Sequence, residues 1–270
     1  MTDSRRKSEI CVAPSHKCSG RENKMLRKHL HADILKMKGT PVILAHILIP
    51  IITSGVFLLY YSFSAWNDAT KIMAFYQAVG AGFPVLIGIF CASVAAQEKK
   101  AGGFQNLLSL PHKTTAFWSK VFLLLLFGMF SILFTAILFG YGFCRTPGCS
   151  ISIGLCITMA LIMWCSSIPL YLWQMILAFQ FGEGVSVCAG IVSSLVSALM
   201  LTGLGKFIWK FTVISWTARI PYTFLKLVFG EVGAYDELKA VLPLYAIFTV
   251  ISMLYYFLWA SYFEGCKLSE

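Results

Sequence analysis

The chain has 270 residues, of which 58% are hydrophobic and only 13% are charged. Average soluble domains contain roughly 45–50% apolar and about 25% charged residues, so this composition excludes an ordinary soluble protein. The charges are also clustered, which leaves six uncharged runs that each exceed the ~20 residues needed to cross a bilayer. These runs are Gly39–Asn67, Ile72–Gln97, Val121–Cys144, Thr146–Gly182, Val185–Gly205 and Ala240–Phe263. The sequence therefore predicts an all-α membrane protein with six transmembrane helices.

The N-terminal 24 residues, Met1–Lys24, are polar and basic with little apolar periodicity, which predicts a disordered arm. Met25 opens a more helix-like stretch and is an alternative translation start, in which case residues 1–24 are not translated. From Leu26 to Lys38, apolar residues recur at spacings of three and four among basic ones. This pattern predicts an N-terminal amphipathic helix at the inner membrane interface, although a soluble helix that docks on a partner has the same pattern.

The expected spans follow in one domain, residues 25–270. They cover about Pro41–Phe63, Ala74–Ala96, Val121–Phe143, Ile151–Phe179, Val185–Leu204 and Val241–Phe263. Six spans place both termini on one side of the membrane, and that side holds 15 of the 22 Lys and Arg residues. Because basic residues concentrate in cytoplasmic segments, we expect both termini to be cytoplasmic.

Span five repeats small residues at every fourth position, namely Ser186, Gly190, Ser194 and Ala198. A stripe of this kind lets two helices approach closely. The neighbouring helix can belong to a second subunit or to the same one, and the sequence leaves both alternatives open.

The segment between spans five and six, Lys206–Leu238, is too charged to span the membrane. It nevertheless carries seven aromatic residues between Phe207 and Phe229. Aromatic residues gather at membrane interfaces, so this segment predicts a re-entrant or interfacial aromatic hairpin.

The sequence contains few residues that could carry out catalysis or bind a metal. Cys144 and Cys149 flank a short outer loop, and their spacing fits both a disulfide and a pair of free thiols. The chain lacks a metal-binding pattern, a catalytic pair and a phosphate-binding loop. We therefore expect no enzyme activity, no metal and no cofactor of its own, and ATP has to be bound by another subunit.

The loop between spans two and three, Gln97–Lys120, contains the most distinctive motif. Gly102 and Gly103 interrupt the preceding helix, and Phe104–Leu110 then predicts a short amphipathic helix that ends at Pro111. So short a helix is stable only when it packs on something. The membrane surface and a groove on a cytoplasmic partner are the two candidates.

This loop resembles the type-2 ABC exporter permeases, and the resemblance extends from about Met25 to the C-terminus. A glutamate ends span two, a glycine and Phe-x-x-Leu-Leu-x-x-Pro follow, and a lysine opens span three. The residues that match are Glu98, Gly103, Phe104, Asn106, Leu107, Leu108, Pro111 and Lys120. His112-Lys113-Thr114 departs from the pattern, in which an arginine is common after the proline.

In that family the loop is the coupling helix that contacts the ATPase. The resemblance thus assigns this role to Glu98, Gly103, Phe104, Gln105, Asn106, Leu107, Leu108 and Pro111. It also implies two ATPase subunits that hold ATP and Mg²⁺, and a second permease that is identical or distinct. The stripe Ser186, Gly190, Ser194 and Ala198 would then be a candidate permease–permease contact.

Within this family, the segment EKKAGGFQNLL (residues 98–108) most resembles the lantibiotic-immunity permeases. It implies a bacterial cell membrane exporter that expels amphipathic cationic peptides, with membrane lipids but no nucleic acid as further partners. No substrate-binding residue can be named. The alternatives are an ABC exporter of a lipid, glycan or drug, and an ATP-independent carrier or channel. Such carriers usually place charges at the midplane, where the six runs have none.

Overall fold

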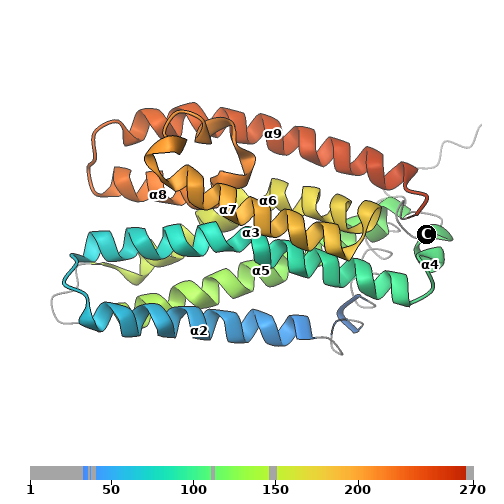
Figure 1. The fold of residues 1–270 in the computed structure, drawn as a ribbon, viewed down its shortest axis with the longest axis horizontal. Helices are drawn as coiled ribbons and strands as arrows, with labels where there is room; N and C mark the ends of the chain where they lie inside the picture. Colours follow the sequence, from blue (N-terminus) through green and yellow to red (C-terminus); the bar gives the residue numbers. More distant parts are fainter. Residues whose placement is uncertain (1–32, 36, 38–40, 111–112, 146–150, 266–270) are drawn as a thin grey trace, which may run out of the picture.

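The computed structural model describes residues 33–35, 37, 41–110, 113–145 and 151–265. Over these residues the chain is helical and contains no strand. Six of the helices are long and apolar enough to cross a membrane, which confirms the six predicted spans. They form one elongated bundle (Figure 1) and comprise α2 (Pro41–Phe63), α3 (Asp68–Lys100), α5 (Lys113–Phe143), α6 (Ile153–Phe181), α7 (Glu183–Leu201) and α9 (Ala234–Tyr262).

Three of these helices are longer than the sequence predicts, and one of them is α9, which begins at Ala234 rather than at Val241. α3 has 33 residues and α5 has 31, and both continue past the uncharged runs into charged sequence. At 1.5 Å per residue each is roughly 45–50 Å long, well beyond the ~30 Å hydrocarbon core. The extensions carry Glu98 at the end of α3 and Lys120 near the start of α5, so both residues lie on helices rather than in a loop.

The two ends of the bundle differ. α2 begins and α9 ends near the short helix α4 (Gln105–Leu108), whereas α8 (Trp216–Val228) and the α2–α3 connection lie at the opposite end (Figure 1). We call these the α4 end and the α8 end. The assignment of the α4 end to the cytoplasm stays a prediction, which rests on the distribution of basic residues.

α3 is the most deeply buried span and the centre of the packing. A Cβ added to Gly88 would lie 2.8 Å from the carbonyl oxygen of Ser186 on α7, and one added to Gly80 would lie 2.5 Å from that of Thr217 on α8. The Thr217 hydroxyl also donates a hydrogen bond of 2.9 Å to the Gly80 carbonyl. Small residues permit such close contacts, which provide much of the association energy between helices in lipid.

The segment between α7 and α9 folds back onto the bundle. Three short 3-10 turns, η1 (Gly203–Gly205), η2 (Trp209–Phe211) and η3 (Val213–Ser215), lead into α8. Trp209 and Trp216 are buried in an apolar cluster of their own, whereas Phe207 and Phe211 are exposed. The position of this aromatic segment relative to a membrane stays a prediction.

The predicted amphipathic helix Leu26–Lys38 lies mostly outside the described residues, as does the arm Met1–Lys24. Asp33, Ile34 and Leu35 are helical, and the side chain of Met37 is buried. The interfacial placement of this helix stays a prediction.

Candidate functional site

The connection from α3 to α5 turns through three consecutive residues with positive φ. Gly102 has φ +129° and Gly103 has φ +59°, and Phe104 follows with φ +69°. Glycine adopts this region freely, but a residue with a Cβ pays roughly 1–2 kcal/mol for it. Packing compensates for this strain at Phe104, because its side chain is buried and its ring lies 5.6 Å from that of Phe179 and 5.9 Å from that of Phe263.

α4 is a single turn with two different faces. Phe104 and Leu107 point into the bundle and are buried, whereas Gln105, Asn106 and Ser109 are exposed. Leu108 and Leu110 are half-buried between these faces. The Asn106 amide donates a hydrogen bond of 2.6 Å to the carbonyl of Ala101, which ties the turn to the end of α3. The part of α4 that a partner can reach is therefore mainly polar.

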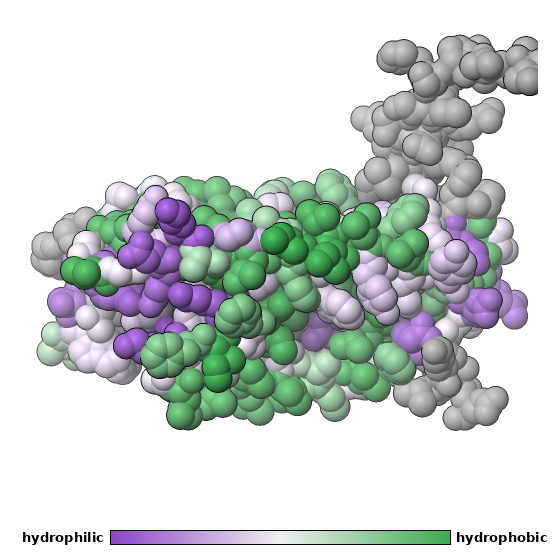
Figure 2. Space-filling view, turned by 90° about the horizontal axis from the view of Figure 1, so that it is seen from above, coloured by the Kyte–Doolittle hydropathy of each residue, from purple (hydrophilic) through white to green (hydrophobic). Residues whose placement is uncertain are grey.

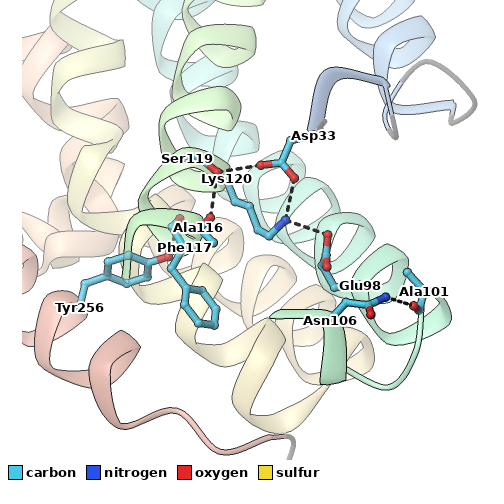
Figure 3. A network of polar contacts seen from close by, with 9 residues as sticks. All are labelled: Asp33, Glu98, Ala101, Asn106, Ala116, Phe117, Ser119, Lys120 and Tyr256. Atoms are coloured by element: carbon cyan, nitrogen blue, oxygen red, sulfur yellow. Dashed lines mark hydrogen bonds and ion pairs between the residues drawn. The ribbon is translucent and has the colours of Figure 1, made fainter. Parts of the chain in front are cut away.

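A buried charge network lies beside this turn (Figure 3). The Lys120 ammonium donates to Oδ1 of Asp33 at 2.8 Å and to Oε1 of Glu98 at 2.7 Å. Ser119 donates to the other carboxylate oxygen of Asp33 at 2.7 Å. Each of the three charged side chains is at most 10% exposed. The network joins the segment before α2 to the end of α3 and the start of α5.

Buried ion pairs of this kind contribute little net stability, because desolvation of the charges offsets their attraction. Loss of one partner is costly, however, since it leaves an uncompensated buried charge. Asp33, Glu98 and Lys120 therefore hold three elements in one fixed arrangement. A displacement of the segment before α2 has to break or carry along the ends of α3 and α5.

The structure places the residues of the predicted coupling helix in three groups. Glu98, Phe104 and Leu107 are buried in the bundle, Gln105 and Asn106 are exposed, and Leu108 is half-buried. A Cβ on Gly103 would meet open space. Pro111 lies outside the described residues.

Asp33 is the functional candidate that the sequence motif did not identify. It is the only acidic residue between Glu22 and Asp68, within a stretch rich in Lys and Arg. An isolated carboxylate in a basic amphipathic segment is a signal for a specific ion pair. Its partner is not evident from the sequence, because Lys120 lies 87 residues away.

The small-residue stripe of α7 contacts α3 of the same chain. Ser186 donates a hydrogen bond of 3.0 Å to the carbonyl of Gly88, and Ser194 donates one of 2.6 Å to that of Ala81. A Cβ on Gly190 would lie 2.9 Å from the carbonyl oxygen of Pro84. Ala198 is exposed. Intrachain packing thus accounts for three of the four residues that were candidates for a permease–permease contact.

The cysteine prediction concerns a loop that is only partly described. Cys149 lies outside the described residues, so a disulfide with Cys144 stays a prediction. The Cys144 thiol donates to the carbonyl of Ile151 at 3.0 Å. Across the described parts of the chain, no three His, Cys, Asp or Glu side chains gather to hold a metal ion.

Residues 29–197 match the family model described as ABC-2 family transporter protein. No curated protein and no solved structure matches the chain. The matched range includes Asp33, the α3–α5 connection and Lys120, and it spans more than half of the sequence. Members of this family are the membrane subunits of transporters whose ATPase is a separate subunit, and they are not ATPases themselves. With its six apolar helices, the chain is a multi-pass membrane protein that belongs to the ABC-2 transporter family.

Proposed function

We propose that the chain is the permease subunit of a bacterial exporter that removes amphipathic cationic peptides of the lantibiotic type from the cell membrane. The assignment as a permease subunit rests on the match to the ABC-2 family. The resemblance of the α3–α5 connection to the lantibiotic-immunity permeases supports the peptide substrate. In this proposal the chain works with two ATPase subunits and a second permease.

The exposed face of α4 is the contact that we propose for the ATPase. Gln105 and Ser109 project from the bundle, whereas Phe104 and Leu107 fix the turn from within. A push on α4 therefore acts on the apolar cluster around Phe104 and on the adjoining ends of α3 and α5. These helices would transmit the movement across the membrane.

The α8 end is where we propose that the peptide meets the permease. Hydrophilic residues gather there, whereas apolar residues dominate the middle of the visible face (Figure 2). Phe207 and Phe211 are exposed, and so are the acidic side chains of Glu231 and Asp236. Exposed rings and carboxylates together suit an amphipathic cationic peptide, although interfacial anchoring explains the rings as well.

The experiment is a mild-detergent purification of the tagged chain from its native host, with identification of co-eluting proteins by mass spectrometry. We expect an ATPase with a phosphate-binding loop. Ser109→Trp, on the exposed face of α4, should abolish its recovery. Ser62→Trp, exposed at the opposite end of the bundle, is the matched control and should not change it.

The peptide substrate needs a separate test. Deletion of the gene should sensitise the host to particular lantibiotics, and expression of the chain with its ATPase should restore resistance. Unchanged sensitivity across a panel of lantibiotics would overturn the peptide proposal and leave the exporter of a lipid, glycan or drug. In the co-purification experiment, recovery of the chain without any ATPase, even after crosslinking, would contradict the proposed contact between α4 and an ATPase.

A further inference from the structure

A lateral cleft of ≈ 330 Å³ opens near the middle of the bundle, between α2, α3 and α5. Its wall includes Thr53 of α2, Gly82 of α3 and Ser131 of α5, which lie close to the midpoints of these long helices. α5 contributes Ser131, Ile132 and Thr135 to the lining of the cleft, and its ribbon lies between those of α2 and α3 in Figure 1. The cleft is thus near the middle of three membrane-spanning helices and far from both ends of the bundle, where we expect the centre of the bilayer.

The wall of the cleft is mainly apolar and includes the rings of Phe57 and Phe83. Of its few hydroxyl groups, that of Thr135 already donates a hydrogen bond of 2.8 Å to the carbonyl of Ser131 within α5. The volume is roughly twice that of the ~150 Å³ apolar cavity that holds benzene in an engineered protein. A cleft with this lining, near the middle of membrane-spanning helices, is suited to a hydrocarbon group.

The cleft opens to the outside of the bundle at Gly82. This residue is exposed, and a Cβ added to it would meet nothing within 4 Å. The neighbouring surface of α2 is apolar, with Ile52 and Val56 each 59% exposed. The group that can enter is therefore one that the bilayer itself supplies at its centre, where the ends of phospholipid acyl chains lie.

We propose that this cleft binds the terminal part of one phospholipid acyl chain, which enters between α2 and α3. The chain end separates α2 from α3 while α2 remains packed on α5. The site is distinct from the α4 end and from the α8 end, so it goes beyond the proposed contacts with the ATPase and the peptide.

The test uses the full chain in lipid nanodiscs that contain phosphatidylcholine with a photoactivatable diazirine on one acyl chain. With the diazirine near the terminal methyl group, we expect crosslinks to the wall residues Thr53, Gly82 and Thr135. With the diazirine near the glycerol, crosslinks to these residues should fall at least about tenfold, because that part of the lipid stays at the interface.

Gly82→Leu and Gly55→Leu form a matched pair. Both glycines lie in membrane spans, and a Cβ on either one meets nothing within 4 Å. Gly82 is in the wall of the cleft, whereas Gly55 faces outward and is not. Gly82→Leu should reduce the crosslinks to Thr53 and Thr135 at least about tenfold, and Gly55→Leu should leave them unchanged.

Thermal stability and elution volume show whether both variants keep the fold, and Gly82→Ile serves as a second substitution if the leucine does not. Native mass spectrometry should show one retained lipid fewer for the Gly82 variant alone. Equal labelling in both variants, or labelling spread evenly over the outer face of α2, would overturn the proposal. Displacement of the label by an added cationic amphipathic peptide would also overturn it, because the cleft would then belong to the exported substrate.

Discussion

The ammonium of Lys120 on α5 lies 2.7 Å from the carboxylate of Glu98 on α3, and both side chains are only 4% exposed. The pair closes the α3–α5 connection from within, just behind the single turn of α4. Asp33 adds a second carboxylate at 2.8 Å from the same ammonium. The charged residues of the loop motif, Glu98 and Lys120, therefore make contacts inside the bundle. The side chains that α4 exposes, by contrast, are polar and uncharged.

Replacement of Lys120 by Met should destabilise the permease strongly. The substitution leaves two carboxylates buried without their cation, and breaking a buried pair in this way typically costs about 3–5 kcal/mol. A thermal denaturation curve of the detergent-solubilised chain, followed by size-exclusion chromatography, measures the effect. Lys99→Met is the matched control, because Lys99 is adjacent to Glu98 but exposed.

The double variant Glu98→Gln with Lys120→Met separates charge from shape. It should recover part of the stability that Lys120→Met loses, because one of the two buried negative charges that faced the Lys120 ammonium is removed. If Lys120→Met unfolds at the same temperature as Lys99→Met, the network does not hold the three elements together.

The two faces of α4 predict opposite effects for two acidic substitutions. Leu107→Asp puts an unpaired carboxylate into the apolar cluster and should lower the unfolding temperature by several degrees, since such burial costs well over 1 kcal/mol. Gln105→Asp changes an exposed side chain and should leave the unfolding temperature within ±1 °C or so, because surface substitutions rarely exceed ~0.5 kcal/mol.

Recovery of the ATPase separates the two variants further. A lower recovery with Gln105→Asp at unchanged stability indicates that the exposed face makes the contact. If Leu107→Asp is as stable as the parent chain and only recovery falls, then Leu107 faces the partner and not the bundle.

Arg219 should hold the segment between α7 and α8 in place. Its guanidinium donates hydrogen bonds to the carbonyls of Met200 (2.6 Å) and Thr202 (3.1 Å), at the end of α7 where helical partners are lacking. Arg219→Met should increase the rate of proteolysis between residues 202 and 215, and each lost charged hydrogen bond should cost roughly 1.5–3 kcal/mol.

Lys206→Met is the control for Arg219, since Lys206 is an exposed cation in the same segment. It should leave the proteolysis rate unchanged. Arg219→Lys should fall between the two, because a lysine supplies one point of charge where the guanidinium donates from two nitrogens. Equal cleavage rates in Arg219→Met and Lys206→Met would show that Arg219 does not hold the segment in place.

Features of this fold that depend on local composition can be predicted from the sequence, whereas features that depend on contacts between distant residues cannot. α2 begins and ends where the hydrophobic run predicts it, because the length of a span is set by local composition. α3, α5 and α9 are all longer than the sequence predicts. Near α4, the start of α5 meets a distant partner, since Lys120 pairs with Asp33, and the hydrophobic pattern carries no sign of that pairing. The orientation of α4 also depends on such partners, since Phe104 meets residues from α6 and the chain that follows α9.

The small-residue stripe of α7 is a second feature that the sequence predicts only in part. Its spacing predicts close packing but carries no information about which helix is the neighbour. Gly88 of α3 supplies the complementary surface, and that relationship appears only once both helices are placed. A stripe within one subunit and a stripe between two subunits have the same sequence.

The crossing of α3 and α7 should therefore be intolerant of a single added methyl group at Gly88. An ideal Cβ at this position lies 2.8 Å from a backbone oxygen of Ser186 and 3.1 Å from the Cα of Gly190, so the helices have to separate. Overpacking of this kind costs about 1–3 kcal/mol. Gly88→Ala should lower the unfolding temperature by several degrees, whereas Gly55→Ala, with open space around the added methyl, should not.

Separation of the helices would also lengthen the hydrogen bond from Ser186 to the Gly88 carbonyl, so amide exchange along α7 should rise in the Gly88 variant alone. Identical unfolding temperatures for the two alanine variants would mean that α7 does not pack on α3 within one chain, and the stripe would then be free to form the contact between two permeases.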